Sequence, residues 1–183
     1  MTTSFIQDNN RLFDALRTAL KQDMANLSIQ ANGGRSILFV FPPEDEADYI
    51  NAAPKQLKSG FQFIDFRRSY EQFISKIGQD TFDSLYKDLG TEVFFSQTMH
   101  PTLFDHIIEE IRQAYEAGMI PVLIHTGMTV DYGFSNINIM ENEVVMTAKL
   151  PLVVFYPATF DQNGTLKFLG KYNASKYRCI VVK

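Results

Sequence analysis

Four apolar runs predict the strands of a buried β-sheet. They are ILFVF at 37–41, FQFIDF at 61–66, PVLIHTG at 121–127 and PLVVFYP at 151–157. Each run is a nearly continuous block of aliphatic and aromatic residues rather than an alternation of apolar and polar ones. Such blocks are typical of parallel strands, because helices cover both faces of a parallel sheet. We therefore expect a three-layer α/β fold with a mostly parallel sheet.

Amphipathic helices are predicted before and between these strands. Residues 102–117 have the clearest pattern, with apolar side chains three and four apart and Gly118 directly after the helix. Similar spacing predicts a long helix at 4–28, ahead of the first strand, and further helices at 44–57, 67–78, 80–90 and 135–148. Since no repeat or linker interrupts this order, we expect residues 1–183 to form one domain.

The end of the chain follows a different pattern from the rest. The segments TLKFLG at 165–170 and YRCIVV at 177–182 are short, and polar residues separate them. This arrangement predicts a C-terminal antiparallel hairpin or an edge of the sheet.

Composition narrows the classes of function. The chain has 183 residues, 45% of them hydrophobic, with a net charge of −4 and a pI near 5.4. An acidic protein does not hold nucleic acid through its overall field, because that requires a basic face. The N-terminus has no charged segment followed by an apolar one, and no apolar stretch approaches membrane-spanning length. We expect a cytoplasmic protein without membrane contact.

The first strand-to-helix turn has the wrong chemistry for a nucleotide phosphate. Proteins that bind ATP or GTP place G-x-x-x-x-G-K-[ST] there, so that free backbone amides surround the phosphates. This chain has FPPEDEAD at 41–48, in which two prolines remove amide donors and the carboxylates repel phosphate. The predicted sheet therefore lacks a Walker A loop, and we expect no nucleotide cofactor.

Carboxylates near the strand ends leave two interpretations open. Asp45, in the acidic turn, and Asp65, at the end of the second strand, are oxygen ligands of the kind that suit Mg²⁺. The favoured interpretation is an acidic helix start on a solvated face, with no metal. His125 ends the third strand, and Asp131 is the carboxylate that we expect to orient it if it acts as a general base. The favoured interpretation of His125 is a structural histidine.

A basic and aromatic segment closes the chain. Residues 165–183 contain no carboxylate and carry cations at Lys167, Lys171, Lys176 and Arg178 among the rings of Phe168, Tyr172 and Tyr177. Such a segment is found on nucleic-acid surfaces, and also on sheet edges that lysines protect from aggregation. Of these two, we favour the edge. The same rings, surrounded by lysines, are candidates for anchors of a partner protein.

Several segments together resemble the BrxB family of BREX phage-exclusion systems. They are RSILFVFPPEDEADYI at 35–50, FQFIDFRRSYEQF at 61–73, VLIHTG at 122–127 and the block PLVVFYPATFDQNGTLKFLGKYNASKYRCIVV at 151–182. The resemblance implies an ATPase-like α/β core without its nucleotide loop. It also implies a non-catalytic role in antiviral defence, as an adaptor or scaffold for PglZ and other BREX proteins, with no cofactor.

Two alternatives come from other classes of function. One is a metal-dependent phosphoryl hydrolase, with Asp45 and Asp65 at the ion and His125 as acid or base. The other is a DNA-binding accessory subunit that uses the C-terminal cations.

Overall fold

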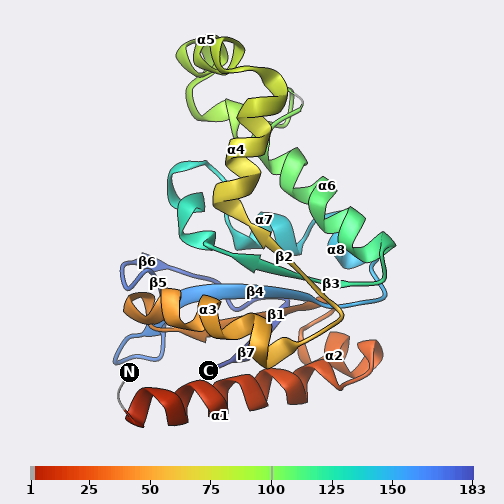
Figure 1. The fold of residues 1–183 in the computed structure, drawn as a ribbon, viewed down its shortest axis with the longest axis vertical. Helices are drawn as coiled ribbons and strands as arrows, with labels where there is room; N and C mark the ends of the chain where they lie inside the picture. The colour runs from red at the N-terminus through yellow and green to blue at the C-terminus, as the bar shows by residue number, and fades with distance from the viewer. Residues whose placement is uncertain (1–2, 100) are drawn as a thin grey trace.

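A mostly parallel β-sheet forms the centre of the molecule in the computed structural model, which describes residues 3–99 and 101–183 (Figure 1). Five parallel strands lie side by side in the order β2 (Phe61–Asp65), β3 (Ile120–Ile124), β4 (Leu152–Phe160), β1 (Ser36–Phe41) and β7 (Cys179–Val182). Two short strands, β5 (Leu166–Phe168) and β6 (Tyr172–Asn173), add an antiparallel extension to the end of β4. The predicted α/β class is confirmed.

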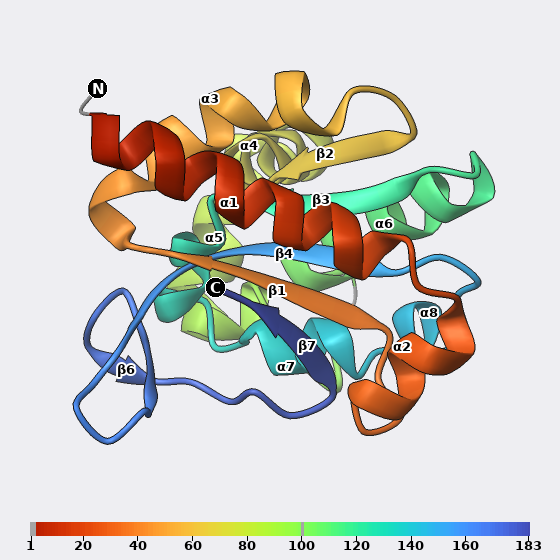
Figure 2. The same cartoon turned by 90° about the horizontal axis from the view of Figure 1, so that it is seen from below.

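Helices cover both faces of the sheet. One face carries α1 (Thr3–Leu20), α2 (Met24–Gln30) and α3 (Glu46–Leu57), as Figure 2 shows from below. The opposite face carries α4 (Phe66–Ile77), α6 (Leu103–Glu116), α7 (Asn136–Met140) and α8 (Glu143–Met146). Alternate side chains of β1 belong to different cores. Leu38 packs on the side of α4 and α6, and Phe39 packs on the side of α1 and α3. Burial on both faces explains the continuous apolar runs.

Aromatic rings fill the core beneath α1 and α3. The ring of Phe39 on β1 lies 4.9 Å from that of Phe13 and 4.7 Å from that of Phe155, measured between centroids. Tyr49 of α3 stacks on Phe41 at 4.8 Å. These contacts join the N-terminal helix, the first helical crossover and the two central strands, so these rings serve internal packing.

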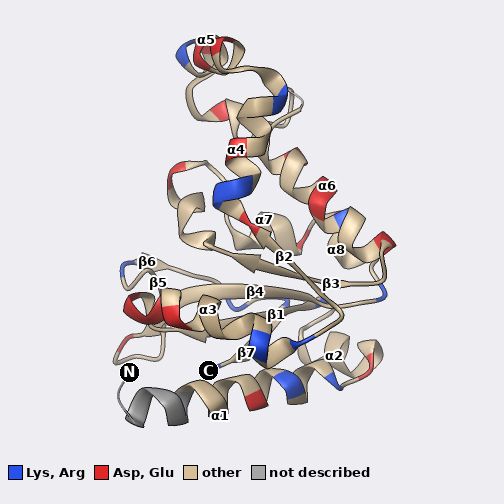
Figure 3. Ribbon diagram, in the orientation of Figure 1, with Lys and Arg blue, Asp and Glu red and all other residues tan. Residues whose placement is uncertain are grey.

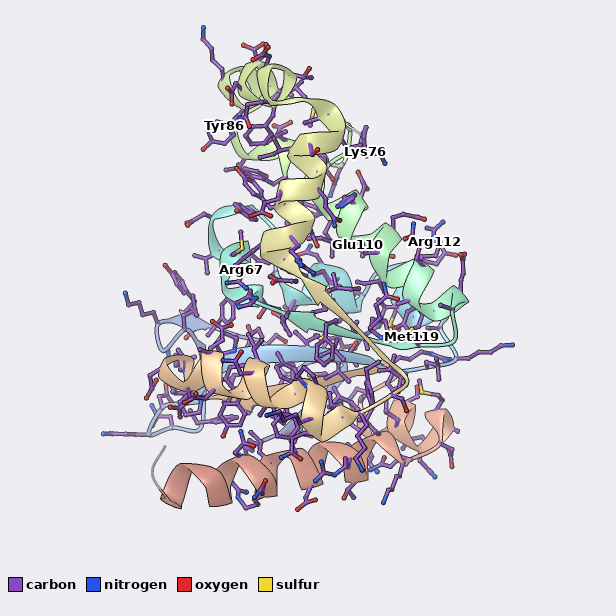
Figure 4. All side chains as sticks on the ribbon, viewed as in Figure 1. Arg67, Lys76, Tyr86, Glu110, Arg112 and Met119 are labelled. Atoms are coloured by element: carbon purple, nitrogen blue, oxygen red, sulfur yellow. The ribbon has the colours of Figure 1, made fainter. Side chains whose placement is uncertain are left out.

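A helical arm projects from the other face (Figure 1). It consists of α4, α5 (Gln79–Leu89), the 3-10 helix η2 (Gly90–Val93) and α6. Tyr86 lies at its tip, while Arg67 lies at its base beside the sheet (Figure 4). Within the arm Ser69 of α4 donates to Glu110 of α6 over 2.5 Å, and rings such as Phe82 and Phe94 pack between the helices.

Two predicted helices are each divided in the structure. The N-terminal helix stops at Leu20 and a second one starts at Met24, because the side chain of Asp23 accepts the amide of Asn26 and begins a new helix. Asn142 in the same way caps α8, through the amide of Val144, and separates it from α7. Capping side chains inside a long periodic pattern are the physical reason for both differences.

The C-terminal segments do not pair with each other as a hairpin. Leu166–Phe168 pairs with β4 and β6, whereas Cys179–Val182 runs parallel to β1 at the edge of the sheet. The chain reaches this edge by passing close to Gly34, where a Cβ atom would lie 1.9 Å from the carbonyl oxygen of Arg178. Only glycine allows this approach of two backbones.

We predict that Gly34→Ala destabilises the protein by about 3 kcal/mol, since the added methyl group must displace the entry to β7. Gly33→Ala is the matched control: Gly33 has φ +86° but open space around its Cα, so strain alone should cost about 1 kcal/mol. Urea denaturation of both variants measures the difference. Equal losses of stability would show that the close approach is not what requires glycine.

Candidate functional site at the carboxyl ends of the strands

An acid–histidine pair lies where β2 and β3 end. Asp65 pairs with Ile124 across the two parallel strands, which places the next residue, His125, beside the carboxylate. His125 Nδ1 lies 2.8 Å from Asp65 Oδ1, and both side chains are largely shielded from solvent. Two residues that are 60 positions apart in the sequence are therefore in direct contact. They lie at the carboxyl ends of the strands, where open α/β proteins bind their ligands.

Asp65 also begins the arm. Its carboxylate accepts the backbone amide of Arg67 over 3.0 Å and so caps α4. The same carboxylate accepts the Arg67 guanidinium through Nε and Nη2, at 3.2 and 3.0 Å. Burial opposes ionisation of Asp65, but these hydrogen bonds and the nearby His125 outweigh it and lower the pKa of the carboxyl group. A structural role as a helix cap thus accounts for part of this arrangement.

The backbone at His125 fixes the imidazole at the strand end. His125 has φ 56° and ψ 37°, a left-handed conformation that turns the chain from β3 into the 3-10 helix η3 (Thr126–Asp131). Thr126 secures this turn, since its hydroxyl donates to the carbonyl of Phe155 on β4 over 2.8 Å. Because the ionised carboxylate of Asp65 can only accept, His125 Nδ1 carries the proton between them, which leaves Nε2 as the basic nitrogen.

Glu46 completes the ionic cluster from the first turn of α3. It is half-buried, and its Oε1 atom has no hydrogen-bond partner among the described residues. Burial raises the pKa of Glu46, while His125 and Arg67 oppose that rise. One electrostatic unit is therefore formed by Glu46, Asp65, Arg67 and His125. Within it the anionic form of Asp65 is stabilised, whereas that of Glu46 is not.

The other predicted acidic residues have different roles. The orienting partner of His125 is Asp65 and not Asp131, which lies at the end of η3. Asp45 is partly exposed, and partial burial together with the charges of Glu44 and Asp48 raises its pKa. Within the described part of the chain, no group of three or more His, Cys, Asp or Glu side chains could hold a metal ion. Arg67 was not among the predicted site residues, although Asp-x-Arg at a strand-to-helix junction is a visible capping pattern.

The turn after β1 differs from a phosphate-binding loop in structure as well as in sequence. Pro42 and Pro43 lead into the 3-10 helix η1 (Pro43–Asp45), and the amide of Asp45 donates to the carbonyl of Pro42. Carboxylates gather at this point, as the red start of α3 shows in Figure 3. The turn thus offers few free donors and a negative field.

The C-terminal rings divide into buried and accessible ones. Phe168 is buried and stacks on Tyr156 of β4, with centroids 4.5 Å apart. Tyr172 is 49% exposed and Tyr177 is 51% exposed. Two of the three predicted anchors can therefore reach a partner in the folded protein, and the third is part of the core.

Several C-terminal cations are engaged within the molecule. Lys167 Nζ lies 3.7 Å from Asp161 and donates to Asn173, and Arg178 Nε lies 3.6 Å from Glu141. Lys176 is placed over the ring of Phe160, at 5.6 Å from its centroid. Partial neutralisation of this kind weakens a phosphate-binding surface.

Comparisons with protein-family models, with curated proteins and with solved structures gave no match to this chain. Among the described helices, none combines the length and the apolar character needed to cross a membrane. The chemistry available at the strand ends is therefore the main guide to function. It offers an oriented histidine base with its carboxylate.

We predict opposite pH dependence for the two carboxyl groups of the cluster. The pKa of Asp65 is lowered in the folded state, so its stabilisation is present above the ordinary value of 3.8 and disappears as the pH falls through the lowered value. Asp65→Asn should cost about 2 kcal/mol near neutral pH, since hydrogen bonds to a charged group are lost, and the loss should shrink in acid.

Glu46→Gln is the matched comparison for that substitution. The pKa of Glu46 is raised, so this group favours the folded state at low pH and the benefit is lost as the pH rises through the raised value. The variant should be as stable as the parent protein, or more stable, near neutral pH. Urea denaturation from about pH 7 down to about pH 2 measures how the free energy of unfolding of each variant depends on pH. The same pH dependence in both variants would contradict the opposite pKa shifts of Asp65 and Glu46.

Proposed function

We propose that this protein is a non-catalytic adaptor or scaffold of a BREX-type antiphage defence complex, and that PglZ is its partner. The sequence resemblance described above supports the proposal, as does the family's ATPase-like core without a nucleotide loop. The observation that carries it is the turn at Pro42–Asp45, where prolines and carboxylates occupy the place of a phosphate-binding loop. A parallel sheet modified in this way retains a rigid scaffold and lacks the usual means of binding a nucleotide.

The accessible rings of the C-terminal segment are the proposed anchors for the partner. Tyr172 and Tyr177 expose about half of their surface, and basic side chains such as Lys171 and Lys176 stand beside them in the sequence. Large aromatic side chains with a polar rim are typical of binding hot spots. The surface thus fits a partner that offers apolar pockets surrounded by acidic groups.

Substituting both Tyr172 and Tyr177 by Ala should weaken the binding of PglZ by about 2 kcal/mol or more, because anchor residues of this kind dominate interface energies. Affinity is measured by calorimetry or a quantitative pull-down, and circular dichroism checks the fold. Tyr86→Ala is the matched control, since Tyr86 is 47% exposed at the tip of the arm, away from the proposed surface. Undiminished affinity of a folded double variant would refute the proposed surface.

Phe168→Ala should lower stability, unlike the tyrosine double variant and Tyr86→Ala. Its ring is buried against Tyr156, so truncation should lower the free energy of unfolding by about 3 kcal/mol or more. This outcome separates a core ring from an interface ring within one short segment.

A phosphoryl hydrolase is the second candidate, and the contact between His125 and Asp65 favours it. A histidine oriented by a carboxylate can act as general acid or base, and the ionic cluster lies at the sheet edge where substrates bind in α/β enzymes. In the predicted scheme Asp45 and Asp65 bind a divalent cation. The pair with Arg67 already occupies both oxygens of Asp65, so the metal would have to displace it.

Hydrolysis of p-nitrophenyl phosphate in the presence of Mg²⁺ or Mn²⁺ tests this candidate. If it is correct, His125→Gln should lower the rate by about 100-fold or more, the size expected for a lost general acid or base. Lys149→Gln, a substitution outside the cluster, is the control. No turnover by the parent protein, together with no thermal stabilisation by either metal, would leave the adaptor as the proposed function.

DNA binding through the C-terminal cations is the weakest of the three functions. Lys167 and Arg178 lie close to carboxylates, which compete with phosphate for the same charges. The overall charge of −4 adds a repulsive background.

A further inference from the structure

A cavity of about 360 Å³ lies beside the carboxyl half of β4. One wall comes from η3, α7 and the segment that links them, and the other comes from β5, β6 and the residues that follow. Tyr156 of β4 lies between the two walls. This volume falls in the range of small-molecule sites, and its position at the carboxyl ends of parallel strands is where such sites occur.

The lining of the cavity contains no ionisable acid or base other than tyrosine. Its members are Thr, Val, Gly, Phe, Ser, Asn, Ile, Tyr and Ala residues. The charged cluster around His125 and Asp65 contributes none of its side chains. Lys167 lies behind the lining, where it donates to Asn173, but its charge is already paired with Asp161. A charged ligand would therefore lose hydration here without gaining a free counter-charge, so the site favours a neutral molecule.

Aromatic rings form one side of the cavity. Tyr156 stacks on Phe168 with an angle of 15° between the ring planes, and Phe168 pairs directly with Tyr172 across β5 and β6. Directly opposed residues of antiparallel strands place their side chains on the same face, so Tyr172 continues this aromatic wall toward solvent. Stacked rings of this kind favour a planar ligand.

A buried amide that borders the cavity has an unpaired donor. Asn136 is only 7% exposed, and its Oδ1 accepts the hydroxyl of Tyr156 over 3.2 Å. Its Nδ2 atom is buried without any acceptor among the described residues. Unpaired buried donors cost free energy. A ligand carbonyl oxygen would satisfy this donor once the Asn136 amide turns toward the cavity, since the Nδ2 atom is covered in the structure.

We propose that this cavity binds a small, neutral, planar molecule that carries a carbonyl or carboxamide group, with the ring against Phe168 and Tyr172 and the carbonyl oxygen on Asn136. The proposal goes beyond the adaptor role and does not depend on it. Each feature excludes one class of ligand: the uncharged lining excludes ions, the aromatic wall disfavours bulky saturated rings, and Asn136 disfavours pure hydrocarbons.

Saturation-transfer NMR with three matched probes on the full chain tests the ligand class. Nicotinamide is neutral and planar with a carboxamide, nicotinate is its anionic counterpart, and cyclohexanecarboxamide is neutral but not planar. At probe concentrations on the order of 10 mM, we expect signal for nicotinamide and at least about tenfold weaker affinity for the other two. No saturation of nicotinamide, or equal affinity for nicotinate, would overturn the proposal.

The place of binding is tested on the parent protein and on two tryptophan variants. Amide shifts caused by nicotinamide should concentrate in residues 129–138 and 168–175 and at Tyr156, which together include the cavity lining. Ala174→Trp should fill the cavity from its rim and lower affinity at least about tenfold, whereas Lys171→Trp, on the same segment but outside the lining, should leave it unchanged. Amide shifts elsewhere in the parent protein would refute this site even if Ala174→Trp failed to fold.

Discussion

The parallel pairing of β1 with β4 is the interaction on which the rest of the structure depends. Six consecutive residue pairs, from Ser36 with Leu152 to Phe41 with Pro157, hold the two strands in register. Both strands are buried on both faces, so their side chains nucleate two separate cores, one under α1 and α3 and one under α4 and α6. Because parallel strands end on the same side of a sheet, this pairing also brings the carboxyl ends of β1 and β4 together.

The carboxyl ends of the strands carry two regions, one charged and one uncharged. The ends of β2 and β3 hold the ionic cluster of Asp65, Arg67, His125 and Glu46, whereas the end of β4 borders the uncharged cavity around Tyr156. η3 separates the two regions and contributes to both, through His125 at its start and Thr129 within it. The first region holds acidic and basic side chains in contact, and the second is the cavity for which we propose a neutral ligand.

The helical arm gives the molecule a second distinctive surface. Helices α4 and α6 extend beyond the sheet and carry α5 away from it (Figure 1). A stack of rings stabilises this projection, with Phe94 lying 4.3 Å from Tyr132 and Tyr70 lying parallel to Tyr132. The arm begins at the Asp65 cap, so a disturbance of the ionic cluster reaches the base of α4 directly. The ionic cluster and the arm therefore share Asp65.

The sequence by itself determined the class of fold, because continuous apolar runs and amphipathic periods are local signals of buried strands and covering helices. It also indicated the missing phosphate loop, since prolines and carboxylates at 42–46 act through their own chemistry. Tertiary structure decided the rest. Local patterns do not encode the order of parallel strands, and so the partner of His125, the place of Cys179–Val182 beside β1 and the need for glycine at position 34 were not visible. The cavity likewise depends on Asn136, Tyr156 and Phe168, which come from three separate elements and share a site only because the sheet brings them together.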